Sequence, residues 1–281
     1  MLLVLLMLCA VGVTAALVYG NRRWTAATEQ LRDRMERARV PFGTKIFSPG
    51  ELAGLPQPVQ HYFGAALVDG LRMVTDVAIV QRGTFNQSEG APAWKPFTAV
   101  QRMVMRRPGF FWDARIRTWP GVRVRVRDAY VTGEGIRRAS VYGLFNVANL
   151  RDSGELAKAE LMRLLAEAVW YPTALLPSQG VQWSAVDDHS ARAAFSDGSI
   201  TVSLLFRFNP AGLIESFRAE GRGRLVGGKV TSLPWEGRFW DYSVRSGMCV
   251  PLEGEVAWVH PTGVKPYWRG RVTGIDYEYA H

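Results

Sequence analysis

The stretch Arg115–Arg127 reads Arg-Ile-Arg-Thr-Trp-Pro-Gly-Val-Arg-Val-Arg-Val-Arg, and it decides the fold class. On either side of Trp119-Pro120-Gly121, charged and apolar residues alternate with the two-residue period of a half-buried β-strand. Pro and Gly at the centre predict a tight turn. Because so short a connection has no room for a crossover helix, we expect the two strands to be antiparallel.

The same pattern continues on both sides of this hairpin and predicts a protein of the α+β class that is mainly β. One internal helix interrupts the strands: Asp152 and Glu155 match a capping box, and Pro172 ends the helical pattern. No linker or repeat divides residues 45–281, which we expect to form a single β-rich domain. Strands are predicted at 77–81, 97–106, 110–118 and 122–131, and again at 181–186, 191–195, 200–208, 213–219, 235–243, 255–260 and 267–279.

The amino-acid composition excludes several classes of protein and of binding site. The chain has 281 residues, of which 48% are hydrophobic and 11% aromatic, which is typical of a folded protein. Two cysteines and four histidines exclude a disulfide scaffold, and we expect neither a metal site nor a cofactor. The net charge is +9, but no basic run or nucleic-acid motif accompanies it, so no nucleic-acid partner is expected. Attraction to lipid phosphates stays open.

The first residues predict a single-pass membrane anchor. Leu2–Tyr19 contains no charged residue and, as a helix, would measure ~27 Å, close to the ~30 Å hydrocarbon core. A cleaved signal peptide is the alternative, but no Lys or Arg precedes the apolar run. We therefore expect a retained anchor at residues 1–20 and a juxtamembrane helix or linker at 21–44. Arg22 and Arg23 place the main domain in the cytoplasm by the positive-inside rule, with an extracytoplasmic domain as the alternative.

Arginines on the first hairpin admit two interpretations. In residues 122–127, three valines share one face of the predicted strand and three arginines share the other. The arginine face could meet an anionic ligand or lipid headgroups. It could equally be a solvated face whose long side chains cover apolar surface.

The second half of the chain carries a candidate ligand site. Arg163 and Glu167 are one turn apart beside the apolar stripe of the helix, with Glu160 close by. The last strands are dense in aromatic residues, which could build a core or line an apolar pocket with a few polar groups. No catalytic residue is assigned, because Asp187-Asp188-His189-Ser190 are adjacent and triads come from distant segments. The candidate ligand-binding residues are Arg163, Glu167, Trp170, Trp235, Asp241, Glu255, Trp258, Trp268 and Arg269.

Three segments resemble an uncharacterised bacterial family of membrane-anchored proteins. They are Leu-Pro-Gln-Pro-Val-Gln-His-Tyr-Phe at 55–63, Arg-Leu-Leu-Ala-Glu-Ala-Val-Trp-Tyr-Pro-Thr-Ala-Leu-Leu-Pro at 163–177 and Pro-Tyr-Trp-Arg-Gly at 266–270. The order of strands, helix and strands is similar to that of the lipoprotein-carrier half-barrels. This resemblance implies a curved antiparallel sheet with a few covering helices that encloses acyl chains.

These observations leave three hypotheses. The first is a membrane-anchored protein that binds an apolar or lipid-like ligand. The second is a hydrolase that uses carboxylates such as Glu167, Asp241 or Glu255, and the third is an envelope scaffold without a small ligand. The space between the sheet and the helix distinguishes them, because a long apolar cavity favours the first hypothesis, convergent carboxylates the second and a filled core the third.

Overall fold

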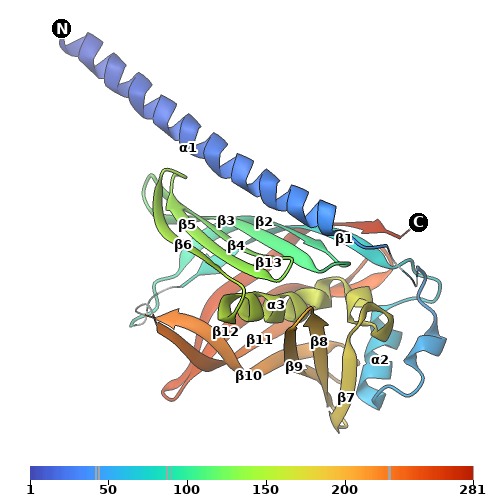
Figure 1. The fold of residues 1–281 in the computed structure, drawn as a ribbon. Coiled ribbons are helices and arrows are strands. Elements are labelled where there is room, and N and C mark those ends of the chain that lie inside the picture. Colours follow the sequence, from blue (N-terminus) through green and yellow to red (C-terminus); the bar gives the residue numbers. More distant parts are fainter. Residues whose placement is uncertain (42, 44, 87, 89, 227–228, 281) are drawn as a thin grey trace.

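The computed structural model describes residues 1–281 except 42, 44, 87, 89, 227, 228 and 281 (Figure 1). The helices span Leu2–Ala38 (α1), Gln57–Ala66 (α2) and Glu155–Glu167 (α3), with short 3-10 helices at Pro49–Leu52, Ala168–Trp170, Pro172–Leu175 and Pro177–Gln179. The strands span Val74–Phe85 (β1), Lys95–Val104 (β2), Gly109–Trp119 (β3), Val122–Val131 (β4), Glu134–Val141 (β5), Phe145–Asp152 (β6), Gln182–Asp187 (β7), Ser190–Asp197 (β8), Ile200–Phe208 (β9), Ile214–Val226 (β10), Lys229–Arg245 (β11), Met248–His260 (β12) and Gly263–Tyr279 (β13).

These strands form one antiparallel sheet in the order β6-β5-β4-β3-β2-β1-β13-β12-β11-β10-β9-β8-β7. It consists of two meanders that join where β1 pairs with β13. The outer strands β6 and β7 do not pair with each other, so the curved sheet stays open along one side (Figure 1). The predicted class, α+β and mainly β with a curved antiparallel sheet, is confirmed.

The two ends of the sheet differ. One end carries the β1–β2 loop and the β3–β4, β5–β6 and β12–β13 turns, and we call it the hairpin end. At the opposite end, α2 packs near β8 and β12, and Gly247 of the β11–β12 turn approaches Val68 and Leu71. We call this the helical end. The strand direction alternates along a meander, so residues early in β6 and late in β12 both belong to the hairpin end.

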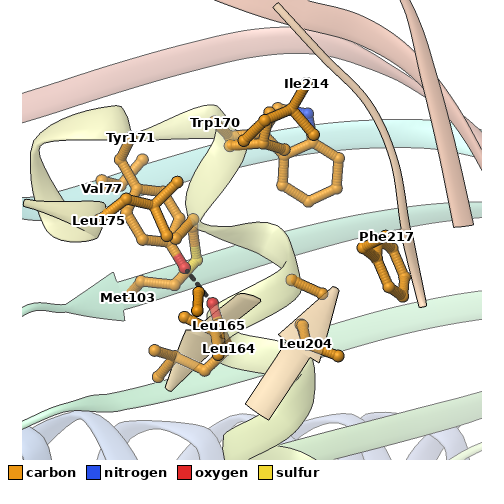
Figure 2. Packing of buried hydrophobic residues seen from close by; sticks show 14 of the residues in the cluster. Val77, Met103, Leu164, Leu165, Trp170, Tyr171, Leu175, Leu204, Ile214 and Phe217 are labelled. Carbon is orange, nitrogen blue, oxygen red and sulfur yellow. Dashed lines mark hydrogen bonds between the residues drawn. The ribbon is translucent and has the colours of Figure 1, made fainter. Parts of the chain in front are cut away.

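The main core lies on the concave face around α3. This helix contacts β4, β5, β9 and β10, so it lies between the two halves of the sheet (Figure 1). Figure 2 shows Leu164 and Leu165 packed beside Val77 and Met103, with the Tyr171 hydroxyl donating a 3.1 Å hydrogen bond to the Leu164 carbonyl. This packing fills the concave face at the helical end with buried aliphatic and aromatic side chains.

The second half of α1 covers part of the convex face, over β3 and β4. The predicted membrane segment and juxtamembrane helix form one continuous helix, which crosses β3 and β4 and projects beyond the hairpin end (Figure 1). Its Leu31 and Met35 join a second core cluster with Val104, Phe111, Ala129, Val131 and Ile136. Because successive side chains on a strand face opposite ways, the same strands serve both cores.

Two local predictions need correction. The internal helix begins at Glu155 rather than directly after Asp152, and Gly154 occupies its N-cap. Asp152 still accepts a 3.2 Å hydrogen bond from the Leu156 amide, so it stabilises the first turn from two residues further back. Ser48-Pro49-Gly50-Glu51 also matches the sequence pattern of a capping box and predicts a helix, but it opens only a four-residue 3-10 helix without a side-chain cap.

Candidate functional site

The concave face contains a cavity of about 740 Å³. Its walls come from β4, β5 and β6 on one side and from β10, β11, β12 and β13 on the other. The C-terminal half of α3 forms the floor, and the β1–β2 loop covers the top, held by a 2.8 Å hydrogen bond from the Asn86 amide to the Tyr267 carbonyl. Several exposed lining residues, among them Ser88, Val147, Val264 and Lys265, lie at the hairpin end, so the cavity opens there.

Aromatic rings form the apolar wall. Trp258 stacks on Tyr267 with ring centres 5.9 Å apart, and the Tyr267 hydroxyl accepts a 3.0 Å hydrogen bond from Trp235. Deeper in the cavity, Trp268 packs 6.4 Å from Trp170. These rings come from consecutive strands of one meander and from the segment after α3, which explains why they gather in one wall.

The floor is a network of ion pairs between α3 and the first meander. Arg163 contacts Glu167 at 2.7 Å and Asp128 of β4 at 3.1 Å. Asp128 also contacts Arg137 of β5 at 3.1 Å, and Arg137 contacts the fully buried Glu160 at 2.8 Å. The second oxygen of Glu167 accepts a hydrogen bond from Gln101. Both carboxylate oxygens of Glu167 therefore have donors.

Arg222 connects this floor to the aromatic wall. Its guanidinium lies 4.4 Å from the ring centre of Trp235 and 5.6 Å from that of Trp258. It donates to the Ala159 carbonyl at 3.1 Å and lies 3.8 Å from Glu160. With Arg137 and Arg163, it makes three arginines facing the three carboxylates Asp128, Glu160 and Glu167. The network is therefore balanced in formal charge.

The pKa values of Glu160, Arg163 and Arg137 are all raised, the first by burial and the other two by their carboxylate partners. Desolvation raises the pKa of Glu160 above its usual value, and the charge of Asp128 adds to the rise, although the arginines oppose it. The pKa of Arg163 is raised despite the opposing effect of burial, because Glu167 and Asp128 favour its charged form. Asp128 also raises the pKa of Arg137. Arg137 and Arg163 therefore stay charged, whereas burial favours the protonated form of Glu160.

Seven of the nine residues predicted as ligand-binding line the cavity, and two do not. Asp241 pairs with Arg271 at 2.7 Å on the surface, and Glu255 is held between Arg238 and Arg269 on the other side of the sheet from the aromatic wall. The three carboxylates proposed for a hydrolase thus have different arginine partners and do not converge. The residues that line the cavity are Arg163, Glu167, Trp170, Trp235, Trp258, Trp268 and Arg269, although the guanidinium of Arg269 binds Glu255 on the other side of the sheet.

Sequence reasoning missed Asp128, Arg137 and Arg222. The first two lie on strands of the first meander, and their approach to α3 depends on long-range pairing. Arg222 lies in Gly221-Arg222-Gly223, which the sequence predicts as a bulge or loop, and a register shift does occur between Ala219 and Arg222. Arginine flanked by two glycines inside a strand is the one local signal, because small neighbours let the backbone approach another element closely. Gly223 does lie against Glu155 of α3.

The arginines of the β4 face do not share one environment. Arg127 is almost fully buried under α1, where it contacts Asp113 at 2.9 Å and donates to the Trp24 carbonyl at 2.9 Å. Neither sequence interpretation describes it, since α1 covers it. Arg123 is exposed, and Arg125 is half-buried.

The N-terminal part of α1 is long and apolar enough to cross a membrane. The apolar part of α1 has a mean hydropathy of 2.6, and none of it is buried by the rest of the protein. Such a helix is compatible with a single-pass anchor or with a signal sequence. Among the residues that the structure describes, no group of three His, Cys, Asp or Glu side chains is placed to hold a metal ion.

Two solved structures resemble the chain. One is a domain from Vibrio parahaemolyticus provisionally assigned to an outer-membrane lipoprotein-sorting protein, with a TM-score of 0.41 and 9% identity over 79% of this chain and 89% of that chain. The other is a LolA-superfamily protein from Nitrosomonas europaea, with a TM-score of 0.29 and 12% identity over 73% of this chain and 86% of that chain.

A comparison with curated proteins found no match. The model of a family of unknown function (DUF6920) matches residues 53–277, which include all three of the segments that suggested an uncharacterised family. Of these segments, 55–63 forms the start of α2, whereas residues of 163–177 and 266–270 line the cavity. The prediction of an uncharacterised family is confirmed, and the chain belongs to the family of unknown function DUF6920.

Proposed function

We propose that the protein is held in a membrane by α1 and binds an apolar or lipid-like ligand in the concave cavity. The observation that carries this proposal is the aromatic cavity of about 740 Å³ that opens at the end where α1 leaves the sheet. Pockets of ~300–1,000 Å³ with mostly apolar walls and a few polar groups are typical of small-ligand sites. An apolar surface of this kind is stabilised when a ligand excludes water from it.

The ionic floor supports the same proposal. Its three arginines and three carboxylates balance in formal charge, so a charged ligand is not needed to neutralise them. The network also holds α3 at a fixed place between the two meanders, because Asp128 and Arg137 come from strands and Arg163 from the helix. A rigid floor under an aromatic wall keeps the cavity from collapsing when it is empty.

Retention of α1 is the second part of the proposal. The apolar run continues past the small residues near Ala15, where a signal peptide would be cleaved. Carbonate extraction should leave the full-length protein in the membrane pellet. A soluble protein that lacks the first ~20 residues, the length of one span, would contradict retention.

The positive-inside rule favours a cytoplasmic domain, because Arg22 and Arg23 follow the span and are exposed. Val244 is an exposed residue near the helical end, far from the span, so Val244→Cys provides a labelling site. With a membrane-impermeant maleimide, this cysteine should react only after cell lysis. Labelling in intact cells would place the domain outside the cytoplasm and leave the ligand proposal untouched.

The ligand proposal is tested by blocking the cavity. Ala148 lines it from edge strand β6, and the exposed Asn149 is the next residue on the same strand and is not part of the lining. Full-length protein purified in mild detergent should carry co-purifying lipid in native mass spectrometry. Ala148→Trp should lose that lipid while Asn149→Trp keeps it. Wild-type protein without bound mass, or equal occupancy in both variants, would contradict the proposal.

A further inference from the structure

Two hairpins of the first meander lie beside the point where α1 leaves the sheet. A Cβ atom on Gly20 would lie 2.5 Å from the Tyr142 carbonyl oxygen and 2.8 Å from a Leu144 side-chain carbon, so helix and β5–β6 turn are in direct contact. The Tyr142 hydroxyl donates to the Gly121 carbonyl, which joins this turn to the β3–β4 turn. The apolar span of α1 lies on the N-terminal side of Gly20.

Large apolar side chains are exposed on these hairpins. Trp119 at the β3–β4 turn is 72% exposed, and Phe145 at the start of β6 is 70% exposed. Val147 of the same strand is also exposed and lines the cavity mouth. Aromatic residues at this position relative to a span are typical of the membrane–water interface, where an apolar ring and a polar environment meet.

Arginines surround these apolar residues without matching acids. Across the β3–β4 pair, Arg115 lies directly opposite Arg125, and Arg117 lies directly opposite Arg123. Like charges in directly opposed positions destabilise a sheet. The sequence contains no Asp or Glu in residues 1–28, 114–127 or 135–151. An anionic partner on this surface would relieve the repulsion.

The electrostatic environments of Arg125 and of one further arginine, Arg138, agree with this crowding. Burial lowers the pKa of Arg125, and the charge of Arg115 lowers it further. Burial likewise lowers the pKa of Arg138, and Arg23 of α1 adds to that effect. Cations from the helix and from three strands therefore face one another around the exit of α1.

We propose that Trp119, Phe145 and the arginine pairs Arg115–Arg125 and Arg117–Arg123 form a second membrane contact, which lies in the headgroup region of the bilayer and binds anionic phospholipids. This inference rests on the proposed retention of α1. Because α1 is packed on β3 and β4, the depth at which its apolar span enters the bilayer also fixes the depth of the β3–β4 and β5–β6 turns. The cavity mouth at the same end then faces the headgroups, and a lipid enters it directly from the bilayer.

The test measures the depth of fluorescent labels on full-length protein in vesicles. Nitrobenzoxadiazole is attached at Trp119→Cys or Phe145→Cys in a Cys9→Ser/Cys249→Ser background. Val244→Cys, exposed near the helical end, is the matched control for an apolar surface residue far from the span. Native Cys9, labelled in the Cys249→Ser protein, reports whether the span itself is inserted. The vesicles are phosphatidylcholine with or without phosphatidylglycerol, with headgroup-nitroxide lipids and aqueous iodide as quenchers.

We expect the labels at 119 and 145 to be quenched severalfold more by nitroxide lipid than the label at 244, and to be protected from iodide. Arg117→Gln/Arg123→Gln should reduce this difference in vesicles that contain phosphatidylglycerol. If the label at Cys9 is in the bilayer while those at 119 and 145 behave like the label at 244, the second contact is wrong and the anchor stands. If the Cys9 label is also in water, the proposed anchor itself is wrong.

Discussion

The indole N–H of Trp24 donates a 2.7 Å hydrogen bond to Asp113, which joins the anchor helix to the convex face of the sheet. Arg127 lies against the same indole, 4.3 Å from the ring centre, and contacts the same carboxylate at 2.9 Å. Thr28, one turn further along α1, also donates to Asp113 at 2.9 Å. The Asp113 carboxylate therefore accepts hydrogen bonds from α1 and from β4. We call this contact of Asp113 with Trp24, Thr28 and Arg127 the joint, and it fixes the direction in which α1 leaves the domain.

Removing the charge at this joint should destabilise the domain. Asp113→Asn leaves the guanidinium of Arg127 buried without its anionic partner, and loss of one member of a buried pair typically costs ~3–5 kcal/mol. Arg115→Gln on the same strand and face is the matched control, because Arg115 is exposed. The measurement is denaturant unfolding of full-length protein in detergent. Equal stability of the two variants would show that the joint contributes nothing.

The floor of the cavity predicts energetic coupling between Arg163 and Glu167. Arg163→Met should cost ~3–5 kcal/mol, since Glu167 and Asp128 both lose a partner in a mostly buried site. Glu167→Gln should cost less, because Arg163 keeps Asp128. The double variant should be more stable than the sum of the single effects implies. A double-mutant cycle with no coupling energy would mean that the two residues act independently.

Glu160 predicts a pH dependence of stability. Its pKa in the folded protein is above the ordinary value of 4.5, so the folded state binds more protons than the unfolded state at pH values between the two. The unfolding free energy must therefore fall as pH rises above about 4.5 through the folded pKa. Glu160→Gln should remove this part of the decline. If the unfolding free energies of wild type and variant changed in parallel from pH 4 to pH 8, Glu160 would not be the source of the pH dependence.

The two tryptophans of the aromatic wall should respond differently to truncation. Trp268 is buried between Phe97 and Trp170, so Trp268→Ala leaves a packed neighbourhood and should cost ~3–5 kcal/mol. Trp258 is only partly buried and faces the cavity, so Trp258→Ala should cost clearly less while ligand occupancy falls. Thermal melts and native mass spectra of the same samples measure both effects. Equal destabilisation with unchanged occupancy would assign Trp258 to the core.

Local patterns predicted strands at β1–β4 and β7–β13, because alternation and short turns are properties of neighbouring residues, but they missed β5 and β6. They could not predict that β1 pairs with β13, since a strand of alternating residues does not identify a partner nearly two hundred positions away. Nor could they place the second half of α1 on the convex face. The burial of Arg127 follows from that packing, and an arginine in an alternating strand otherwise resembles a solvated residue.

The candidate site was predictable where it depended on adjacent strands. Trp235, Trp258 and Trp268 meet because β11, β12 and β13 are sequential neighbours. Glu255 was assigned wrongly to the same wall, although three positions separate it from Trp258 and an odd spacing places two strand residues on opposite faces. Asp128, Arg137 and Arg222 could not be assigned, because their contacts with α3 join segments that are far apart in the chain.

The most direct test of the ligand-binding proposal is photocrosslinking in native membranes with a lipid that carries a diazirine at the end of its acyl chain. The account predicts crosslinked peptides from the cavity wall, in particular those containing Trp258 and Trp268, in addition to peptides from α1. Ala148→Trp should abolish the wall crosslinks and leave those of α1 unchanged, whereas Asn149→Trp should affect neither. Crosslinks confined to α1 and the hairpin tips, with none from the wall in wild-type protein, would contradict a lipid-binding cavity.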